Sequence, residues 1–193
     1  MTREALELSP PRRVLLIKPS ALGDVVTALP VLRGLRRSFP GAHLAWLVSD
    51  ACAALVEGDS DLDEVVHFPR RRLGRAWRSP KAALELARFL RSLRRGGYDW
   101  VIDLQGLFRS GYFARATRAR VRAGLADAKE GAALWYTHRI TVDETHTVKR
   151  NIALARRLGI DARVEDMTLE VPPAGKDFAG ILAQSRGLDR GGY

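Results

Sequence analysis

Two kinds of segment alternate along this chain, and each has its own spacing of apolar residues. Short aliphatic runs such as Val14-Leu15-Leu16-Ile17 are typical of strands buried on both faces of a sheet. Such runs predict strands at residues 13–18, 42–48, 64–68, 98–104, 120–125, 139–142 and 167–171. Apolar residues at helical spacing predict helices at residues 24–37, 80–95, 107–118 and 146–158. Strands that alternate with helices indicate an α/β fold with a mainly parallel sheet.

Local signals mark where the helices begin, bend and end. Pro30 falls inside the first helical segment, so the helix must kink there or restart. Ser79 followed by Pro80 is a favourable start for the second helix, and Gly96-Gly97 ends it. We expect this helix to bury one apolar face, formed by Leu86, Phe89, Leu90 and Leu93.

The composition is typical of a folded cytoplasmic protein. With 193 residues and 46% hydrophobic content, the chain can bury the core of about one to one-and-a-half domains, which excludes a disordered chain. Its one cysteine, Cys52, excludes a disulfide framework and a Cys-rich zinc site, and we expect it to be a small buried hydrophobe. No apolar run is long enough to span a bilayer, and the N-terminus lacks a signal-peptide core. The sequence therefore predicts a soluble, cytoplasmic location.

The chain carries a formal net charge of +10, and 27 of its 32 basic residues are arginine. Arginine richness has two explanations that the sequence leaves open: genome composition, or selection for binding anions. A basic surface favours phosphates, nucleic acid or anionic lipid headgroups without choosing among them. The densest basic segment lies within nine residues and contains Arg70, Arg71, Arg72, Arg75 and Arg78.

Polar residues follow two of the predicted strands in short turns that contain glycine. Lys18-Pro19-Ser20-Ala21-Leu22-Gly23-Asp24 comes after the first strand, and Asp103-Leu104-Gln105-Gly106 after the fourth. Ligands of open α/β sheets bind outside the carboxyl ends of the strands, so both turns are candidate binding segments. Two readings stay open for each carboxylate. Asp24 either caps the following helix or does chemistry, and Asp103 either lines a site or holds its own turn.

Several familiar chemistries have no motif in this sequence. The first turn matches neither the dinucleotide pattern G-x-G-x-x-G nor the phosphate loop G-x-x-x-x-G-K-[ST]. Zinc-protease, serine-hydrolase and thiol-redox motifs are absent as well. The four histidines are scattered, which favours structural or surface roles. Aromatic residues do not interleave with arginines in the stacking pattern of nucleic-acid-binding proteins, so no nucleic-acid partner is expected.

Five segments in order along residues 13–160 carry a resemblance to a known family. They are Val14-Leu15-Leu16-Ile17-Lys18-Pro19-Ser20-Ala21-Leu22-Gly23-Asp24-Val25; Leu29-Pro30 with Phe39-Pro40-Gly41; Arg71-Arg72-x-x-Arg75-Ala76-Trp77; Tyr98-Asp99-x-Val101-Ile102-Asp103-x-Gln105-Gly106-Leu107; and His146-x-Val148-x-Arg150-Asn151 ahead of Leu158-Gly159. Together they resemble family 9 glycosyltransferases, the lipopolysaccharide heptosyltransferases. The arginine segment is most similar to the heptosyltransferase I branch.

The resemblance implies a GT-B fold, in which two Rossmann-like domains face each other across a cleft. It also implies an acceptor of the Kdo-lipid A type, bound by the N-terminal domain, and the donor ADP-L-glycero-D-manno-heptose, bound by the C-terminal domain. Transfer would invert the anomeric centre without a cofactor or an essential metal. Because the acceptor is a lipid, the resemblance implies contact with the cytoplasmic face of the inner membrane.

The resemblance also implies roles for individual residues. Asp24 matches the general base that takes the proton of the acceptor hydroxyl. The acceptor-binding residues implied by the matched segments are Ser20, Gly23, Arg71, Arg72, Arg75, Asp103 and Gln105.

Members of this family are roughly twice as long as this chain. We therefore expect residues 1–12 to be an extension, residues 13–172 the Rossmann-like acceptor domain, and residues 173–193 a linker towards a missing donor domain. Without that second wall of the cleft, the chain alone is expected to transfer no sugar at a useful rate. Two alternatives remain: a family 9 enzyme with another sugar or acceptor, and a basic module that binds anions or nucleic acid.

Overall fold

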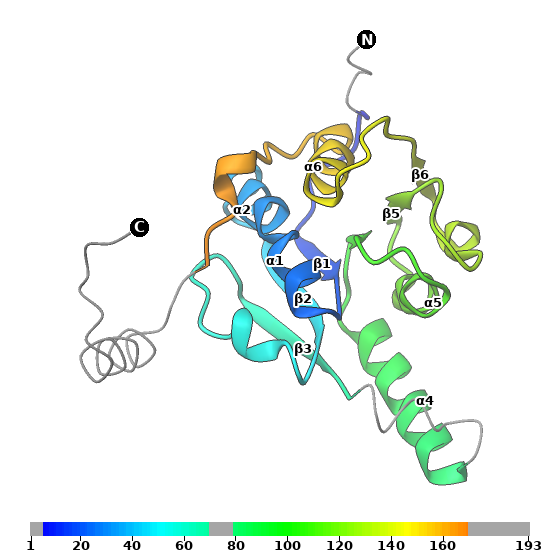
Figure 1. Cartoon of the computed structure of the whole chain (residues 1–193). Coiled ribbons are helices and arrows are strands. Elements are labelled where there is room, and N and C mark those ends of the chain that lie inside the picture. The colour runs from blue at the N-terminus through cyan, green and yellow to red at the C-terminus, as the bar shows by residue number, and fades with distance from the viewer. Residues whose placement is uncertain (1–5, 70–78, 170–193) are drawn as a thin grey trace, which may run out of the picture.

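The computed structural model describes residues 6–69 and 79–169 and contains a six-stranded, entirely parallel sheet. The strands lie in the order β3-β2-β1-β4-β5-β6, and Figure 1 shows β3 and β6 at opposite edges of the sheet. Their bounds are β1 Arg13–Ile17, β2 His43–Ser49, β3 Glu64–Phe68, β4 Trp100–Asp103, β5 Val121–Leu125 and β6 His138–Ile140. The predicted α/β class and parallel sheet are confirmed.

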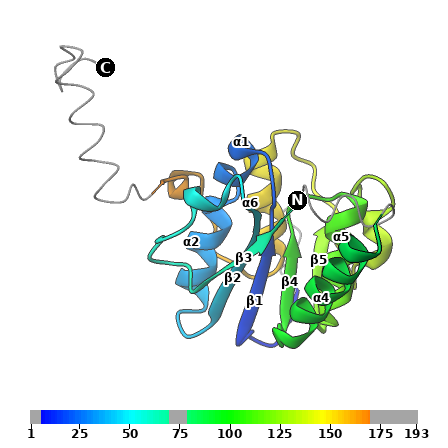
Figure 2. The same cartoon turned by 90° about the horizontal axis from the view of Figure 1, so that it is seen from below.

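Helices cover both faces of the sheet (Figure 2). One layer contains α1 (Leu22–Val26), α2 (Leu29–Ser38) and α6 (Thr147–Arg157). The other layer contains α4 (Pro80–Arg95) and α5 (Phe108–Thr117), which lie side by side. Short 3-10 turns occur at Ala53–Leu55, Ala132–Trp135 and Val164–Asp166.

The helix boundaries follow the local signals in the sequence. The first helical segment is split, as Pro30 requires, and Pro30 lies in the first turn of α2, where its missing N–H costs nothing. Ser79 caps α4 by accepting a hydrogen bond from the N–H of Ala82 at 3.5 Å. Gly96 follows the last residue of α4.

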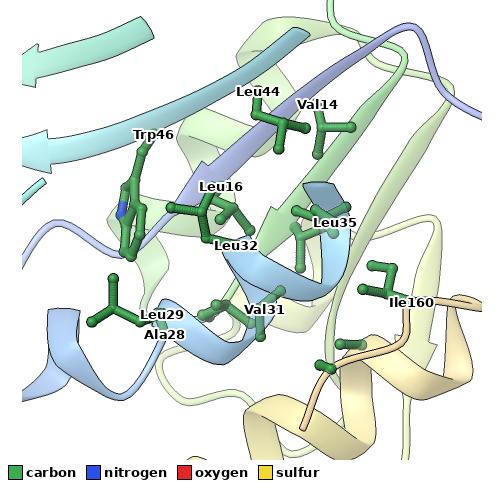
Figure 3. Close-up of a cluster of buried hydrophobic side chains, with 14 of the residues drawn as sticks. Val14, Leu16, Ala28, Leu29, Val31, Leu32, Leu35, Leu44, Trp46 and Ile160 are labelled. Carbon is green, nitrogen blue, oxygen red and sulfur yellow. The ribbon is translucent and has the colours of Figure 1, made fainter. Parts of the chain in front are cut away.

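Two apolar cores lie on opposite faces of the sheet, because successive side chains of a strand point to opposite sides. In β1, Val14 and Leu16 face the α2 and α6 layer, whereas Leu15 and Ile17 face α4 and α5. Figure 3 shows the larger core, in which side chains of α2 meet those of β1 and β2. The sheet is thereby fixed between two layers, and the loops at its carboxyl edge are held on a rigid base.

Two expectations about the elements need correction. The predicted strand at 167–171 is wrong for its described part: Met167 ends the 3-10 turn Val164–Asp166, and residues 167–169 are in no strand. Of the α4 face expected to be buried, only Leu93 is fully buried; Leu86, Phe89 and Leu90 are partly exposed. The segment expected to be a linker, 173–193, lies outside the described residues.

Candidate functional site

The chain reverses its direction of winding between β1 and β4, which are neighbours in the centre of the sheet. After β1 it continues into α1 and α2 on one face, and after β4 it continues into α5 on the other. The two loops therefore diverge at the carboxyl edge, and such a switch point is where open α/β sheets bind ligands. Because Ile17 pairs with Asp103, the two polar turns predicted from the sequence begin at the same level of the sheet.

Lys18 links the two turns, and the sequence-based prediction did not single it out. Its side chain is buried, and Nζ donates a hydrogen bond to the carbonyl oxygen of Leu104 at 2.9 Å. Burial lowers the pKa of the Lys18 ammonium, and the nearby carboxylates of Asp24 and Asp103 partly oppose that effect. A lysine directly after an all-apolar strand was the available signal, because a cation at the end of a buried strand needs a partner.

Asp24 lies in the first turn of α1 and is half-buried. One carboxylate oxygen accepts a hydrogen bond from the backbone N–H of Ala21 at 3.3 Å. Asp24 is the third residue of α1, so its carboxylate caps the helix by reaching back to the backbone of the N-cap residue, as in a capping box. The capping reading is therefore observed, and the partial exposure of the side chain also keeps it accessible to a ligand.

Ser20 and Gly23 belong to the same loop. Ser20 is half-buried, and Gly23 is exposed. A Cβ built on Gly23 meets no atom within 4 Å, and its backbone is not in the left-handed region. The fold therefore does not require glycine at this position, and there is free space around it.

Asp103 holds its own turn from a fully buried position. It is 1% exposed. Oδ1 accepts the backbone N–H groups of Gln105 and Gly106 at 2.9 and 3.1 Å, and Oδ2 accepts the hydroxyl of Tyr136 at 2.6 Å. Burial raises the pKa of the Asp103 carboxyl, and these hydrogen bonds oppose the shift. Of its two readings, the structure favours the architectural one.

Gln105 lines a pocket of about 300 Å³ next to the switch point. Ser20 lines the same pocket, so this cavity brings together one predicted residue from each turn. The Oε1 atom of Gln105 is buried and has no hydrogen-bond partner within the described ranges. A buried acceptor without a partner is costly, and a hydroxyl donor of a ligand could satisfy it.

The remaining predicted residues, Arg71, Arg72 and Arg75, lie outside the described residues. The described chain stops before them at Pro69, just after β3 ends at Phe68. Phe68 lines the pocket that contains Ser20 and Gln105.

Among the described residues, no three His, Cys, Asp or Glu side chains lie together in a group that could hold a metal ion. The expectation for Cys52 is confirmed, because its thiol is free and buried. Among the same residues, no helix has both the length and the apolar character needed to cross a membrane.

Comparison with known proteins identifies the family of the chain. The sequence pattern of Glycosyltransferase family 9 (heptosyltransferase) matches residues 86–179. Lipopolysaccharide heptosyltransferase 1 of Salmonella typhimurium is 32% identical over 154 residues, which are 77% of this chain and 49% of that protein. The chain belongs to glycosyltransferase family 9.

Solved structures agree with this assignment. Heptosyltransferase WaaC of E. coli, solved with ADP-2-deoxy-2-fluoro heptose, is 30% identical and superimposes with a TM-score of 0.69, covering 79% of this chain and 50% of that one. A family 9 glycosyl transferase from Veillonella parvula shares the fold at 23% identity with a TM-score of 0.71, covering 97% and 52%. The chain spans about half the length of the relatives it matches, and its sheet corresponds to one half of the GT-B heptosyltransferase fold.

Proposed function

We propose that this family 9 chain is the acceptor-binding half of an inverting glycosyltransferase. The reaction is transfer of heptose from ADP-L-glycero-D-manno-heptose to an acceptor of the Kdo-lipid A type. The observation that carries the proposal is the switch point between β1 and β4. There, a half-exposed carboxylate at Asp24 stands at a loop that shares a pocket with Gln105.

The chemical step needs one base and no covalent intermediate. The acceptor hydroxyl oxygen attacks the anomeric carbon of the donor, the bond from that carbon to the ADP oxygen breaks, and the configuration inverts. Asp24 takes the hydroxyl proton, and ADP leaves with the bonding electron pair. The Asp24 carboxylate suits this role because, among the described residues, only one of its oxygens accepts a hydrogen bond, from the N–H of Ala21.

Lys18 and Asp103 act through the loops in this proposal and do not touch the substrate. The ammonium of Lys18 ties the β4 turn to the end of β1, and Asp103 fixes the backbone of Gln105. Gln105 then offers its buried Oε1 to a hydroxyl of the acceptor. Ser20 lines the same pocket, and Gly23 adds no side chain to the loop between Ser20 and Asp24.

Arg71, Arg72 and Arg75 are proposed to contact the anionic groups of the acceptor. Guanidinium forks match phosphate and carboxylate oxygens in pairs. This part of the proposal rests on the sequence alone.

The donor belongs to the half of the relatives that this chain does not match. Positioning donor against acceptor supplies several kcal/mol of the barrier in two-substrate enzymes, roughly 7–11 kcal/mol at best. The chain by itself is therefore predicted to release no ADP above background from the donor in the presence of Kdo-lipid A.

A chimera tests the proposal. This chain would replace the matching half of the Salmonella typhimurium heptosyltransferase 1, and ADP release would be measured with both substrates. Turnover that needs both ADP-heptose and Kdo-lipid A supports the proposal. A correctly folded chimera that binds donor but ignores Kdo-lipid A, and accepts another lipid or sugar, would assign this chain to a different acceptor within the family.

A further inference from the structure

Two opposite charges line the pocket beside the switch point and do not pair with each other. Arg109 and Glu130 both belong to the walls of the cavity of about 300 Å³ that contains Ser20 and Gln105. Within the described ranges, the Arg109 guanidinium lies within 4 Å of no carboxylate. Opposite charges in one small cavity attract each other, so their separation needs a structural cause.

An aromatic ring holds Arg109. The guanidinium carbon lies over the ring of Phe68, 5.8 Å from its centroid, which is the distance of a cation–π contact. Phe68 is the last residue of β3 and is 2% exposed, with ring contacts to Phe89 and Phe113. Contact with an aromatic face does not use the N–H donors of arginine, which lie in the guanidinium plane. A rigid ring thus carries a cation whose donors suit an anion.

The backbone of α5 holds Glu130. One carboxylate oxygen accepts a hydrogen bond from the N–H of Phe108, the first residue of the helix, at 3.2 Å. Glu130 has a φ of 54°, in the left-handed region that a residue with a Cβ seldom adopts. Glycine would form this turn more easily, so the glutamate side chain is present at a conformational cost. Such a cost is a reason to look for a role in binding.

The other polar groups of the pocket complete its chemistry. The Oε1 atom of Gln105 is buried and has no hydrogen-bond partner among the described residues. The hydroxyl of Ser110 serves its own turn, because it accepts the N–H of Leu107 and donates to the carbonyl of the same residue. The pocket therefore offers one cation, two kinds of acceptor for hydroxyl groups and the aromatic surface of Phe68. A cavity of this volume is at the small end of ligand sites, so it suits one sugar ring.

We propose that Arg109 and Glu130 are specificity-determining residues, which together select a sugar acid with a single negative charge. Arg109 pairs with the carboxylate of the sugar, and Glu130 and Gln105 accept hydrogen bonds from its hydroxyl groups. A second anionic group on the ring meets the Glu130 carboxylate and is rejected by like-charge repulsion. Because this rests on the proposed function, the sugar acid is the Kdo unit of the acceptor, which carries one carboxylate.

The test is binding of three related sugars to the 193-residue chain. The probes are the methyl glycoside of Kdo, its methyl ester, which lacks the charge, and its phosphate monoester, which has an additional one. NMR titration measures each Kd. We expect the parent to bind the acid at least about tenfold more tightly than either the ester or the phosphate, as one charge-assisted contact allows. Equal affinity for acid and ester, or no binding of the acid, would overturn the proposal.

The Arg109→Gln variant tests the cation. Its affinities for acid and ester should differ by less than about twofold, while the affinity for the ester stays within about threefold of the parent value. Arg115→Gln removes another exposed arginine of α5 that does not line the pocket, so it should keep the tenfold preference. A purely structural role for Arg109 would lower the affinities for acid and ester equally, and that result would reject its part in selection.

The Glu130→Gln variant tests the rejection of a second charge. Glutamine keeps an oxygen that can accept the N–H of Phe108, so the variant loses the charge and not the cap. We expect it to bind the phosphate within about threefold of the acid. Glu165→Gln, at an exposed position in the 3-10 turn Val164–Asp166, should still reject the phosphate. Rejection of the phosphate by Glu130→Gln as well would show that Glu130 only caps α5.

The chimera separates this selectivity from the proposed function. If the parent chimera turns over Kdo-lipid A and Arg109→Gln leaves its KM for that acceptor unchanged, the role of Arg109 is wrong and the proposed function stands. If the parent chimera does not use Kdo-lipid A, the proposed function is wrong, whereas the titrations still decide whether the pocket distinguishes the three sugars by charge.

Discussion

The turns that follow β1 and β4 look alike in the sequence but differ in the structure. Each places a carboxylate and a glycine at the end of a buried strand. After β1, Asp24 is half-buried and gives one oxygen to a single weak capping contact. At the end of β4, Asp103 is 1% exposed and accepts hydrogen bonds from two backbone amides and a tyrosine.

The difference separates a partly exposed carboxylate from a buried one whose hydrogen bonds hold its own turn. A buried carboxylate whose oxygens are all used fixes backbone geometry but cannot take a proton from a substrate without losing those contacts. A partly exposed carboxylate with a free oxygen can. We call the turn after β1, which contains Asp24, the open turn, and the turn at the end of β4, which contains Asp103, the closed turn. The side chain of Lys18 is buried between them and links the two through its hydrogen bond to Leu104.

The largest expected effect is on catalysis, through the open turn. Asp24→Ala in the chimera should lower kcat by about 10³-fold, the scale of a lost general base. The free energy of unfolding should change by less than about 1 kcal/mol, because one capping contact is lost. Steady-state ADP release and urea denaturation measure the two effects. Full activity of the Asp24→Ala variant would show that Asp24 only caps α1 and is not the general base.

In the closed turn, the larger expected effect of a substitution is on the free energy of unfolding. Asp103→Ala leaves the N–H groups of Gln105 and Gly106 and the Tyr136 hydroxyl without their acceptor, so we expect a loss of about 3 kcal/mol in the free energy of unfolding. Urea denaturation of the 193-residue chain measures it. A stability change as small as that of Asp24→Ala would remove the distinction between the two turns.

Much of the fold could be predicted from the sequence, whereas the difference in burial between Asp24 and Asp103 could not. Periodicity located all six described strands, and its one further strand, expected at 167–171, is wrong for residues 167–169, which follow the 3-10 turn Val164–Asp166 packed against α2. Pro30 and Ser79 predicted the helix boundaries because their effects are local. The burial of Asp103 depends on Tyr136, which is 33 residues away, and the burial of Lys18 depends on a carbonyl in another strand's turn. No local pattern encodes such partners.

Lys18→Met tests whether the hydrogen bond between the two turns matters for stability or for catalysis. Methionine has a similar volume, and it removes the hydrogen bond to Leu104 together with the cost of burying the ammonium. These effects oppose each other, so we expect a net loss of about 1 kcal/mol in stability. Such a small loss of stability leaves the chimera folded and should not by itself lower kcat. We nevertheless expect kcat to fall, because Asp24 loses its cationic neighbour. A kcat equal to that of the parent would show that Lys18 contributes to the stability of the fold and not to catalysis.

The pH dependence of stability tests the state of Asp103. Its pKa is raised above the ordinary value of 3.8, so the folded protein holds this proton more tightly than the unfolded chain does. The resulting stabilisation is fully present below about pH 3.8 and is lost as the pH rises through the folded-state pKa. Measured against Asp103→Asn, which does not titrate, the relative stability of the parent should fall as the pH rises above 4. A flat difference curve would show that the hydrogen bonds cancel the effect of burial.

The smallest effect on stability is expected at Gly23, in the open turn. A methyl group there meets no atom within 4 Å, and glycine costs roughly 0.5–1 kcal/mol relative to alanine within a helix. Gly23→Ala should therefore leave the free energy of unfolding unchanged or raise it by about 0.5 kcal/mol. The same methyl group would add bulk next to Asp24 in the sequence, in the loop that we propose contacts the acceptor, so binding of Kdo-lipid A to the chain should weaken. Calorimetric titration measures that affinity, and Gly41→Ala, another glycine with open space around it, is the matched control. If both substitutions left the affinity unchanged, the acceptor would not approach the open turn through Gly23, and the space there would have no part in binding.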